Sequence, residues 1–231
     1  MLIKPILTII SIFICLQLTA QTPTYTTGRL LFKDDFRKGI DSNVWKAEVA
    51  PQPFSSVYVQ QNKLVLDTKG GVTVWLNKLL EGNILIEYDR VVLQDTGRND
   101  RISDLNQFWM ATDPRNVNLF TRTGVLEEYD SLQLYYIGMG GNTNSTTRFR
   151  KYEGNGERTL LQEYKDSSHL LQPNTNYHIK ILVKNGTTCF WVNDVQFFTY
   201  ADPRPLQKGY FGFRSTKSRQ AISEIRIYEV R

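Results

Sequence analysis

Three side chains that suit an anionic sugar recur at every second position of one segment. Arg148, Arg150 and Tyr152 alternate with Phe149 and Lys151, and in an extended strand every second side chain lies on the same face. Neighbouring guanidinium groups repel each other unless an anion lies over them, and their planar donors match a carboxylate. The pattern therefore predicts a site for a uronic acid. The alternative is that the arginines pair with acidic residues of the chain, namely Glu127, Glu128 or Glu153.

Gln133 and Tyr135 alternate in the same way on the preceding segment. If the two segments pair, these side chains line the same face as the arginines, and Tyr135 could act as a general acid or base. In a β-elimination, an arginine neutralises the uronate carboxylate and a Tyr or His removes the neighbouring proton. The expected catalytic residues are therefore Tyr135, His169, Arg148 and Arg150. The alternatives are an ordinary core role for Tyr135 and a solvated or structural role for the loop residue His169.

Residues 106–116 are dense in groups that bind sugars. A sugar has an apolar ring face and hydroxyls of fixed direction, which an aromatic ring and planar amides or carboxylates match. We expect Trp109 to be a stacking platform, with core packing as the alternative. The predicted substrate-binding residues are Asn106, Trp109, Asp113, Arg115, Asn116, Gln133, Asn142, Tyr152 and Arg214.

Metal and cofactor chemistry has little support in the sequence. Cys189, His169 and His178 lie at no zinc-ligand spacing. The Gly-rich segment 138–144 joins two predicted strands and opens no helix, which argues against a nucleotide-phosphate site. We expect no cofactor and no catalytic metal. A structural Ca²⁺ is the one exception, because Asp34 and Asp35 could offer it oxygen ligands.

We predict that the segments that position these groups are strands. Short runs rich in Val, Ile, Tyr, Phe and Thr recur between turn residues, which is typical of an all-β chain. Between Tyr177 and Tyr200 three such runs are separated by Asn-Gly and Asn-Asp, which are strong hairpin signals. We predict roughly twelve to fourteen strands in one antiparallel sandwich domain over residues 30–231. Residues 94–105 form a long polar loop in this interpretation.

The first 20 residues have the layout of a secretory signal peptide. Lys4 precedes an apolar run from Ile6 to Leu18, which ends near the small residue Ala20. This run is too short for a comfortable membrane span. Cys15 would mark a lipoprotein, but the residues before it lack the small side chains that such processing needs. We predict cleavage near Ala20, a linker over residues 21–29, and a secreted or periplasmic protein without a membrane span.

The charge balance does not point to nucleic acid. The sequence has 28 basic and 23 acidic residues, a formal net charge of +5. The Lys and Arg residues are scattered, and no basic block of the kind that binds phosphates is present. The expected partner is a polysaccharide or oligosaccharide, and the oligomeric state stays open.

Several stretches together resemble the concanavalin A-like lectin/glucanase superfamily. They are the Asp34-Asp35-Phe36 opening with Trp45, the strand 177–183, the turn 192–194, the segment 209–214 and the closing strand 225–228. Residues 30–231 are similar to a group of exported Bacteroidota proteins. These in turn are similar to small sandwich proteins encoded beside rhamnogalacturonan-degrading enzymes. The resemblance implies a jelly-roll sandwich that handles carbohydrate.

The sequence departs from the glucanases of this superfamily in its acidic residues. Those enzymes carry a Glu-x-Asp-x-x-Glu or Glu-x-Asp-x-Glu motif, which places the reacting carboxylates on one face of a strand. The nearest acidic cluster, 127–130, has the wrong spacing. We therefore expect a lyase or another glycan-cleaving enzyme that acts on an acidic polysaccharide. A non-catalytic lectin-like accessory protein is the second hypothesis, and a structural or protein-binding domain is the third.

Overall fold

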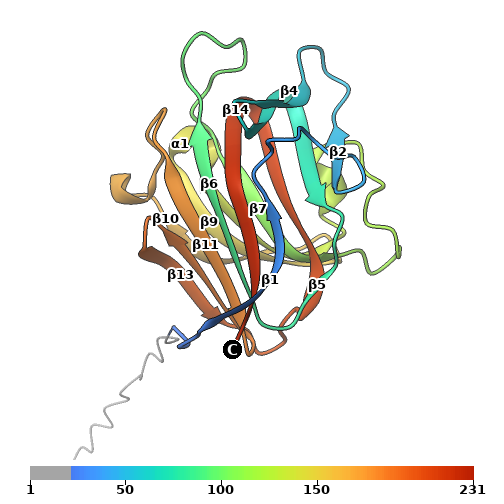
Figure 1. Ribbon diagram of the computed structural model, residues 1–231, viewed down its shortest axis with the longest axis vertical. Helices are drawn as coiled ribbons and strands as arrows, with labels where there is room; N and C mark the ends of the chain where they lie inside the picture. The colour runs from blue at the N-terminus through green and yellow to red at the C-terminus, as the bar shows by residue number, and fades with distance from the viewer. Residues whose placement is uncertain (1–21) are drawn as a thin grey trace, which may run out of the picture.

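Alternating apolar and polar residues form strands over most of the computed structural model, which describes residues 22–231 (Figure 1). The strands are β1 (Thr27–Asp34), β2 (Trp45–Val49), β3 (Ser56–Gln60), β4 (Lys63–Leu76), β5 (Leu80–Glu81), β6 (Ile84–Val92), β7 (Leu105–Thr112), β8 (Gln133–Gly140), β9 (Thr146–Glu153), β10 (Arg158–Tyr164), β11 (Tyr177–Lys184), β12 (Thr187–Val192), β13 (Val195–Ala201) and β14 (Lys208–Val230). Three single helical turns complete the elements: η1 (Leu126–Tyr129), α1 (Gly141–Asn144) and η2 (Ser167–His169).

The predicted all-β antiparallel sandwich is confirmed. The expected hairpins are present between β11, β12 and β13, where Asn185, Gly186, Asn193 and Asp194 all have positive φ. Such left-handed conformations suit Asn, Asp and Gly in two-residue hairpin turns. Three details differ from expectation: β10 was not anticipated, β1 begins at Thr27 rather than at residue 30, and residues 209–214 and 221–230 belong to the single strand β14.

Strand β14 connects the two layers of the sandwich. The main path of hydrogen-bonded strands is β10-β9-β8-β7-β14-β6-β11-β12-β13. The first part of β14, Tyr210–Ser215, pairs with β7, and its second part, Gln220–Glu229, pairs with β6. The pairing with β4 shifts register between Thr216 and Ser218, where Lys217 has a φ of 52°. This bulge lets one continuous strand pass from one layer to the other, as the two red stretches in Figure 1 show.

The main core fills the space between the layers. On β7, β8 and β9 the inward side chains include Trp109, Tyr135 and Phe149, each about 1% exposed. The ring of Trp109 lies 5.6 Å from that of Tyr135 and 5.8 Å from that of Phe149. The intervening side chains on these strands point outward, away from the core.

A second, smaller core lies on the outer face of this layer, beneath the connection between β7 and β8. We call this connection, residues 113–132, the strap. Its Tyr129 packs against Trp75 and Phe108 of the sheet. Buried Glu48 of β2 holds it there: its Oε2 accepts hydrogen bonds from Trp75 Nε1 and Tyr129 Oη, and its Oε1 accepts one from Arg122 N at 2.8 Å. The strap therefore covers part of the face and leaves the rest open.

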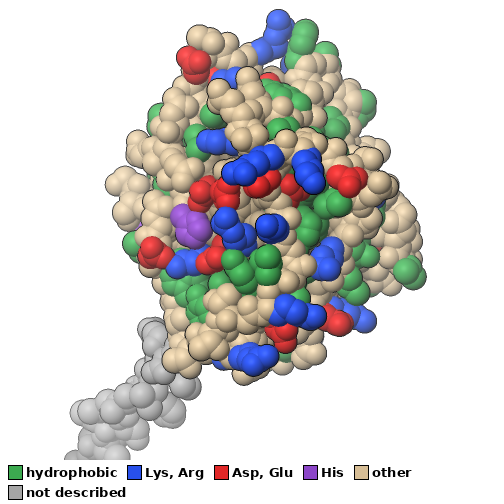
Figure 2. Space-filling view, viewed as in Figure 1, with side chains coloured by type: hydrophobic (Ala, Val, Ile, Leu, Met, Phe, Trp, Pro, Cys, Tyr) green, Lys and Arg blue, Asp and Glu red, His purple; other side chains and the backbone are tan. Residues whose placement is uncertain are grey.

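The face carried by β6, β11 and β14 has no dominant charge. Figure 2 shows Lys and Arg intermixed with Asp and Glu across it, around one His. The charges pair between and along strands, as in His178 with Asp89, Lys180 with Asp194, and Arg226 with Glu224. A mixed surface of this kind gives no footprint for nucleic acid.

Residues 1–21 lie outside the described part of the chain. The predicted signal peptide, its cleavage near Ala20 and the export that follows from it therefore stay predictions. Within residues 22–231, no helix is both long and apolar enough to cross a bilayer. Thr26 and Arg231 exchange backbone hydrogen bonds of 3.0 and 3.1 Å, so the two ends of the described chain lie side by side (Figure 1).

Candidate functional site

The open part of the outer face forms a hollow of about 620 Å³ over β7, β8, β9 and β14, which we call the arginine groove. Residues 124–127 of the strap form one wall, and the turn that contains α1 forms another. Six cationic side chains and two acidic ones line it: Arg101, Arg148, Arg150, Arg158, Arg214, Lys217, Asp104 and Glu127. The groove is therefore strongly basic, although the charges of the whole chain are nearly balanced.

The register of the sheet arranges the groove in rows across the strands. Arg148 of β9 lies opposite Gly138 of β8, which lies opposite Asn106 of β7. Asn106 in turn lies opposite Arg214 of β14. Opposed residues have side chains on the same face of a sheet. Across these four strands the row therefore has an arginine at each side and a side-chain gap at the glycine.

Tyr136 occupies the centre of the groove because of that gap. It lies one row below, opposite Arg150, and its hydroxyl donates a hydrogen bond of 2.8 Å to Asn106 Oδ1. A Cβ atom at Gly138 would meet this hydroxyl and would lie 2.7 Å from Asn106 Oδ1. Glycine at this position thus allows the phenol to lean across the groove floor.

Two of the arginines carry charge that no carboxylate neutralises. Within residues 22–231, neither Arg150 nor Arg214 has an acidic side chain at ion-pair distance, and the Nε atom of each is buried without a hydrogen-bond partner. Arg214 is 1% exposed, and its Nη2 donates to Gly124 O of the strap at 3.0 Å. Burying an unpaired charge is costly, and a bound anion would offset that cost.

The other two arginines of this sheet are partly neutralised. Arg148 Nε pairs with Glu163 of β10, so the predicted pairing with Glu127, Glu128 or Glu153 is replaced by a different partner. Its Nη1 also donates to the side-chain oxygen of Asn142 at 2.9 Å, in the amide orientation that satisfies both groups. Arg158 pairs with Asp130 of the strap. These two guanidinium groups are held in place at the groove wall.

In the groove, burial shifts the pKa values of side chains more than neighbouring charges do. Burial raises the pKa of the Tyr136 hydroxyl well above its usual range; Asp104 adds to this rise, whereas Arg150 and Arg214 oppose it. Burial also lowers the pKa of the Arg214 guanidinium. Tyr136 is thus protonated at neutral pH and can donate a hydrogen bond or a proton. Arg150 lies opposite Tyr136 across β8 and β9, and Arg214 lines the same groove.

The groove brings together six of the predicted site residues. They are Asn106, Asn142, Arg148, Arg150, Tyr152 and Arg214. The even spacing of Arg148, Arg150 and Tyr152 does place all three on one face, as predicted. Their convergence with residues of β7 and β14 follows from strand order, which the spacing alone did not indicate.

The expectation that Gln133 and Tyr135 share this face is wrong. Tyr136, not Tyr135, lies opposite Arg150, so the odd-numbered residues of β8 point the other way. The Tyr135 hydroxyl donates to Asp202 Oδ2 at 2.6 Å on the core side. Burial and this bond raise the pKa of Tyr135 far above its usual range. A register offset by one residue exchanges the two faces of a strand.

Residues 109–116 do not reach the groove. Trp109 lies in the main core, and its Nε1 donates to Thr188 Oγ1 at 3.2 Å, which matches the core-packing alternative. Asp113 binds Arg122 within the strap, at 2.6 Å between Oδ2 and Nη2. Arg115 and Asn116 line a shallow hollow on the outside of the strap. A sugar in the arginine groove would not contact these four side chains.

His169 also lies outside the groove. Its ring stacks on Tyr164 with a centroid distance of 3.7 Å, and its Nδ1 lies 2.7 Å from Asp166 Oδ1. Hydrogen bonds from Ser168 and His169 lower the pKa of Asp166 to about 2. The ring is thus held at the surface by neighbours in its own loop and by an aromatic cluster.

Tyr136, Gly138 and Arg158 are among the groove residues that the sequence does not single out. Side chains alternate between the two faces on β8 as they do on β9. On β8, however, the residue types do not indicate whether the odd or the even positions share the face of Arg148 and Arg150. The sequence places Gly138 in a Gly-rich loop, but in the structure strand β8 continues to Gly140 and includes it. A prediction of the β8–β9 register would have been needed to select Tyr136.

Metal binding gains no support from the described residues. No group of three or more His, Cys, Asp or Glu side chains lies together within residues 22–231. Asp34 accepts hydrogen bonds from Phe36 N and Trp45 Nε1, both at 2.8 Å, and Asp35 accepts one from Arg37 N. The structural Ca²⁺ near Asp34 and Asp35 stays a prediction.

Two sequence comparisons bear on this chain. A family model described as "Domain of unknown function (DUF6250)" matches residues 66–225. Of the residues that line the arginine groove, only Ala50 and Gln52, in the connection between β2 and β3, lie outside this range. No curated protein matches the sequence.

Solved structures share the fold. A protein of unknown function with a galectin-like fold from Bacillus subtilis has a TM-score of 0.73 and 18% identity, covering 90% of this chain and 99% of that one. Carbohydrate-binding module CBM66 from Bacillus subtilis has a TM-score of 0.57 and 13% identity, covering 81% and 96%. An endo-β-1,3-glucanase from Pyrococcus furiosus has a TM-score of 0.62 and 8% identity, covering 91% and 99%. At these identities the likeness establishes a concanavalin A-like jelly roll.

Proposed function

The chain belongs to the family described as a domain of unknown function, DUF6250, and from this premise we propose that it binds an acidic polysaccharide in the arginine groove. One observation carries the proposal: the buried, unpaired Nε atoms of Arg150 and Arg214 beside the central Tyr136. A carboxylate that reached them would replace missing partners and offset the cost of burying the Arg214 guanidinium and the Arg150 Nε group. Neighbours of the same fold include a carbohydrate-binding module and glucanases, which makes a sugar polymer the natural carrier of that carboxylate.

The polymer is proposed to contain uronic acid. Guanidinium groups bind planar carboxylates through two parallel hydrogen bonds, while Asn106 and Asn142 offer amides that suit sugar hydroxyls. The resemblance to proteins encoded beside rhamnogalacturonan-degrading enzymes makes rhamnogalacturonan the first polymer to test, with polygalacturonate and alginate next. Export, predicted from the first 20 residues, would bring the protein to such polymers.

The variant Arg150→Ala tests this function. We expect it to weaken binding to rhamnogalacturonan or polygalacturonate about tenfold to a hundredfold, because a hydrogen bond to a charged group contributes about 1.5–3 kcal/mol. Isothermal titration calorimetry at two salt concentrations measures the affinity, and the salt dependence of binding should become less steep. Arg29→Ala is the matched control, since Arg29 lies on β1 and its side chain is 76% exposed. Equal affinities of wild type and Arg150→Ala for every acidic polymer would refute the groove as the site.

Cleavage by β-elimination is a second candidate function, and the position of Tyr136 favours it. In this reaction the proton beside the uronate carboxylate passes to a base, for which we propose the groove carboxylate Asp104, whose Oδ2 lies 3.4 Å from the Tyr136 hydroxyl. The C–H electron pair forms the new double bond, and the glycosidic C–O bond breaks. The leaving oxygen then takes a proton. The Tyr136 phenol is protonated and lies beside Arg150 and Asn106, so it is placed to give that proton while an arginine neutralises the carboxylate.

Tyr136→Phe separates cleavage from binding. It removes the proton donor and keeps the ring, so the rate of formation of unsaturated uronate, followed by its ultraviolet absorbance, should fall about a hundredfold or more. Affinity for the same polymer should change by less than about tenfold, the effect of one hydrogen bond. A wild-type protein that binds acidic polymers but forms no unsaturated product would leave the lectin-like function alone in place.

A further inference from the structure

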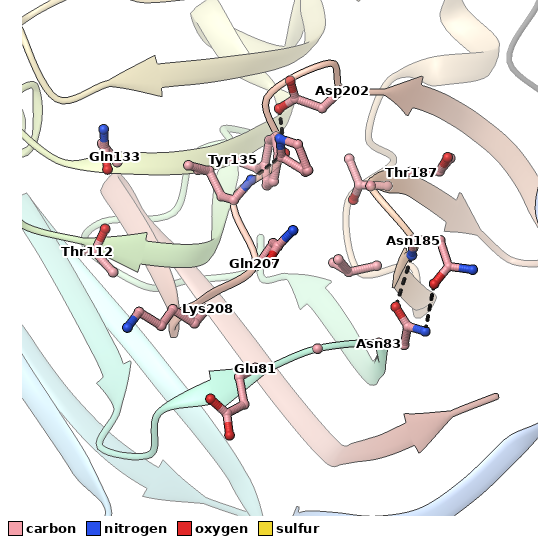
Figure 3. Close-up of a pocket in the computed structure, with 16 residues that line it drawn as sticks. Glu81, Asn83, Thr112, Gln133, Tyr135, Asn185, Thr187, Asp202, Gln207 and Lys208 are labelled. Carbon is pink, nitrogen blue, oxygen red and sulfur yellow. Dashed lines mark hydrogen bonds between the residues drawn. The ribbon is translucent and has the colours of Figure 1, made fainter.

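We infer that the protein has a second saccharide site, for an uncharged sugar unit, in a pocket at the end of the sandwich. This rim pocket has a volume of about 970 Å³, within the range of about 300–1,000 Å³ that is usual for ligand sites. It lies between β5, the turn from β11 to β12, the segment that leads from β13 to β14, and the inward side of β8 (Figure 3). It shares no lining residue with the arginine groove, so the inference does not rest on the function proposed for that groove.

The walls of the rim pocket are held by hydrogen bonds between distant segments. Asn83 and Asn185 bind each other twice: Asn83 Nδ2 donates to Asn185 Oδ1 at 3.0 Å, and Asn185 N donates to Asn83 Oδ1 at 2.9 Å. Gly82 N donates to Gln207 O at 3.0 Å, and Asp202 N donates to Gly186 O at 2.9 Å. Binding sites are usually formed before the ligand arrives, and these bonds give the pocket a fixed shape.

The floor of the rim pocket is electrically neutral. Asp202 Oδ2 accepts the hydrogen bond of Tyr135 and forms an ion pair of 2.8 Å with Lys151 Nζ, and the side chains of Asp202 and Lys151 are 1% and 5% exposed. At the mouth, Glu81 and Lys208 carry opposite charges. The pocket therefore has no net charge for an ionic ligand, in contrast to the arginine groove.

The remaining groups match the hydroxyls and the ring face of a neutral sugar. Thr112 and Gln207 line the cavity with a hydroxyl and an amide group, and the Gln207 amide lies at the centre of the view in Figure 3. Within residues 22–231 these two side chains make no protein hydrogen bond. Pro205 and Leu206 supply an apolar patch beside them. Hydroxyl and amide groups of fixed direction next to an apolar surface are what a sugar ring requires.

Titration with neutral oligosaccharides tests the inference. The probes are cellohexaose, laminarihexaose, mannohexaose and xylohexaose, and binding is followed by calorimetry and by the side-chain amide signals of the Asn and Gln residues in NMR spectra. At least one probe should bind and shift amide signals of the rim pocket. The double variant Thr112→Val with Gln207→Leu should weaken that binding by about tenfold, since it removes two hydrogen-bonding groups. Gln207 is exposed and Thr112 is half-buried, and Thr112→Val preserves side-chain shape.

Arg150→Ala is the matched control, because it alters the arginine groove alone. It should leave binding of the neutral probe unchanged, while the double variant should leave binding of acidic polymers unchanged. The inference is overturned if no probe binds, if the double variant binds as well as the wild type, or if Arg150→Ala removes binding of the neutral probe. If the function proposed for the arginine groove is wrong, the wild-type protein will not bind acidic polymers there, while the neutral probe will still bind to the rim pocket.

Discussion

At Gly138 the floor of the arginine groove has no side chain, and the Tyr136 ring leans across the space that this leaves. The hydroxyl thereby reaches Asn106 on the next strand at 2.8 Å and lies near the two unpaired arginines. Any larger residue at position 138 would compete with it for this space. The atoms that it would meet are the ends of the Tyr136 and Asn106 side chains, which can move without unfolding the sheet.

Gly138→Ala is therefore expected to fold but to lose the central position of Tyr136. The added methyl should cost about 1–2 kcal/mol of unfolding free energy, measured by urea denaturation. It should weaken binding of acidic polymers about threefold to tenfold, as expected for the loss of one hydrogen bond, that between Tyr136 and Asn106. Gly28→Ala is the control: its Cβ would lie 3.0 Å from a backbone oxygen on β14, far from the groove. If Gly138→Ala binds like the wild type, the position of the phenol does not matter for recognition.

The residue scale also shows where prediction from sequence ends. Arg148, Arg150 and Tyr152 could be assigned to one face because alternation within a strand has a fixed period. Tyr135 was chosen over Tyr136 because nothing within β8 indicates which of its faces pairs beside those arginines. The same holds for Trp109. An indole ring suits sugar stacking, but whether Trp109 is buried depends on which face of β7 packs against the other layer. Side-chain type predicts chemistry, while register decides whether the side chain is available.

At the scale of elements, the strap depends on one buried carboxyl group. Glu48 accepts hydrogen bonds from two strap groups, Arg122 N and Tyr129 Oη, and from Trp75 Nε1 of the sheet. Burial raises its pKa above the ordinary 4.5, although these bonds and Arg122 partly oppose the rise. The strap forms a wall of the arginine groove through residues 124–127, so the state of Glu48 affects the site.

The raised pKa of Glu48 predicts a pH dependence of stability. Above about pH 4.5 the folded protein holds the Glu48 proton more tightly than the unfolded chain does. The free energy of unfolding therefore decreases as pH rises from 4.5 through the folded pKa. Glu48→Gln removes this titrating group. The unfolding free energy of the variant, measured by urea denaturation at several pH values, should therefore decrease less steeply with rising pH than that of the wild type. Glu157→Gln, at an exposed turn residue, should keep the wild-type slope; identical slopes for all three proteins would contradict the prediction.

Which elements form was largely predictable, and how they join was not. The β11–β12–β13 hairpins follow from local turn chemistry in Asn185-Gly186 and Asn193-Asp194. The sequence predicts two separate strands in place of β14, because the polar residues 215–220 resemble a loop. In the structure Ser215, Ser218 and Gln220 are buried and bond to one another, so they continue the strand. Polar residues with partners inside a fold cannot be told from loop residues by composition.

At the scale of the whole molecule, the first and last strands form one antiparallel pair. Strand β1 pairs with β14 from Thr27 with Val230 to Asp34 with Ile225, and the neighbouring residues Thr26 and Arg231 bond to each other. The chain thus closes on itself through its ends. In the connection between β1 and β2, Arg37 and Lys38 are both exposed, and the bonds there are local, from Arg37 N to Asp35 and from Gly39 N to Phe36 O.

A circular permutant should therefore fold. Joining residue 231 to residue 22 and opening the chain between Arg37 and Lys38 would turn β14 and β1 into a hairpin. We expect unfolding free energy within about 2 kcal/mol of the wild type, because the new ends lie in an exposed turn. A second permutant opened between Arg214 and Ser215, inside β14, should fail to fold. Circular dichroism and urea denaturation check both, and the reverse order of stability would show that closure through the ends is unimportant.

The position of β14 after every other described strand has a consequence for the order of events during synthesis. Strands β1, β4, β5, β6 and β7 all pair with Lys208–Val230, which is synthesised after them. Until then the edges of these five strands that pair with β14 stay open. The native sheet therefore cannot be completed before β14 is made, and an export step that acts earlier would meet a chain whose sheet is still open.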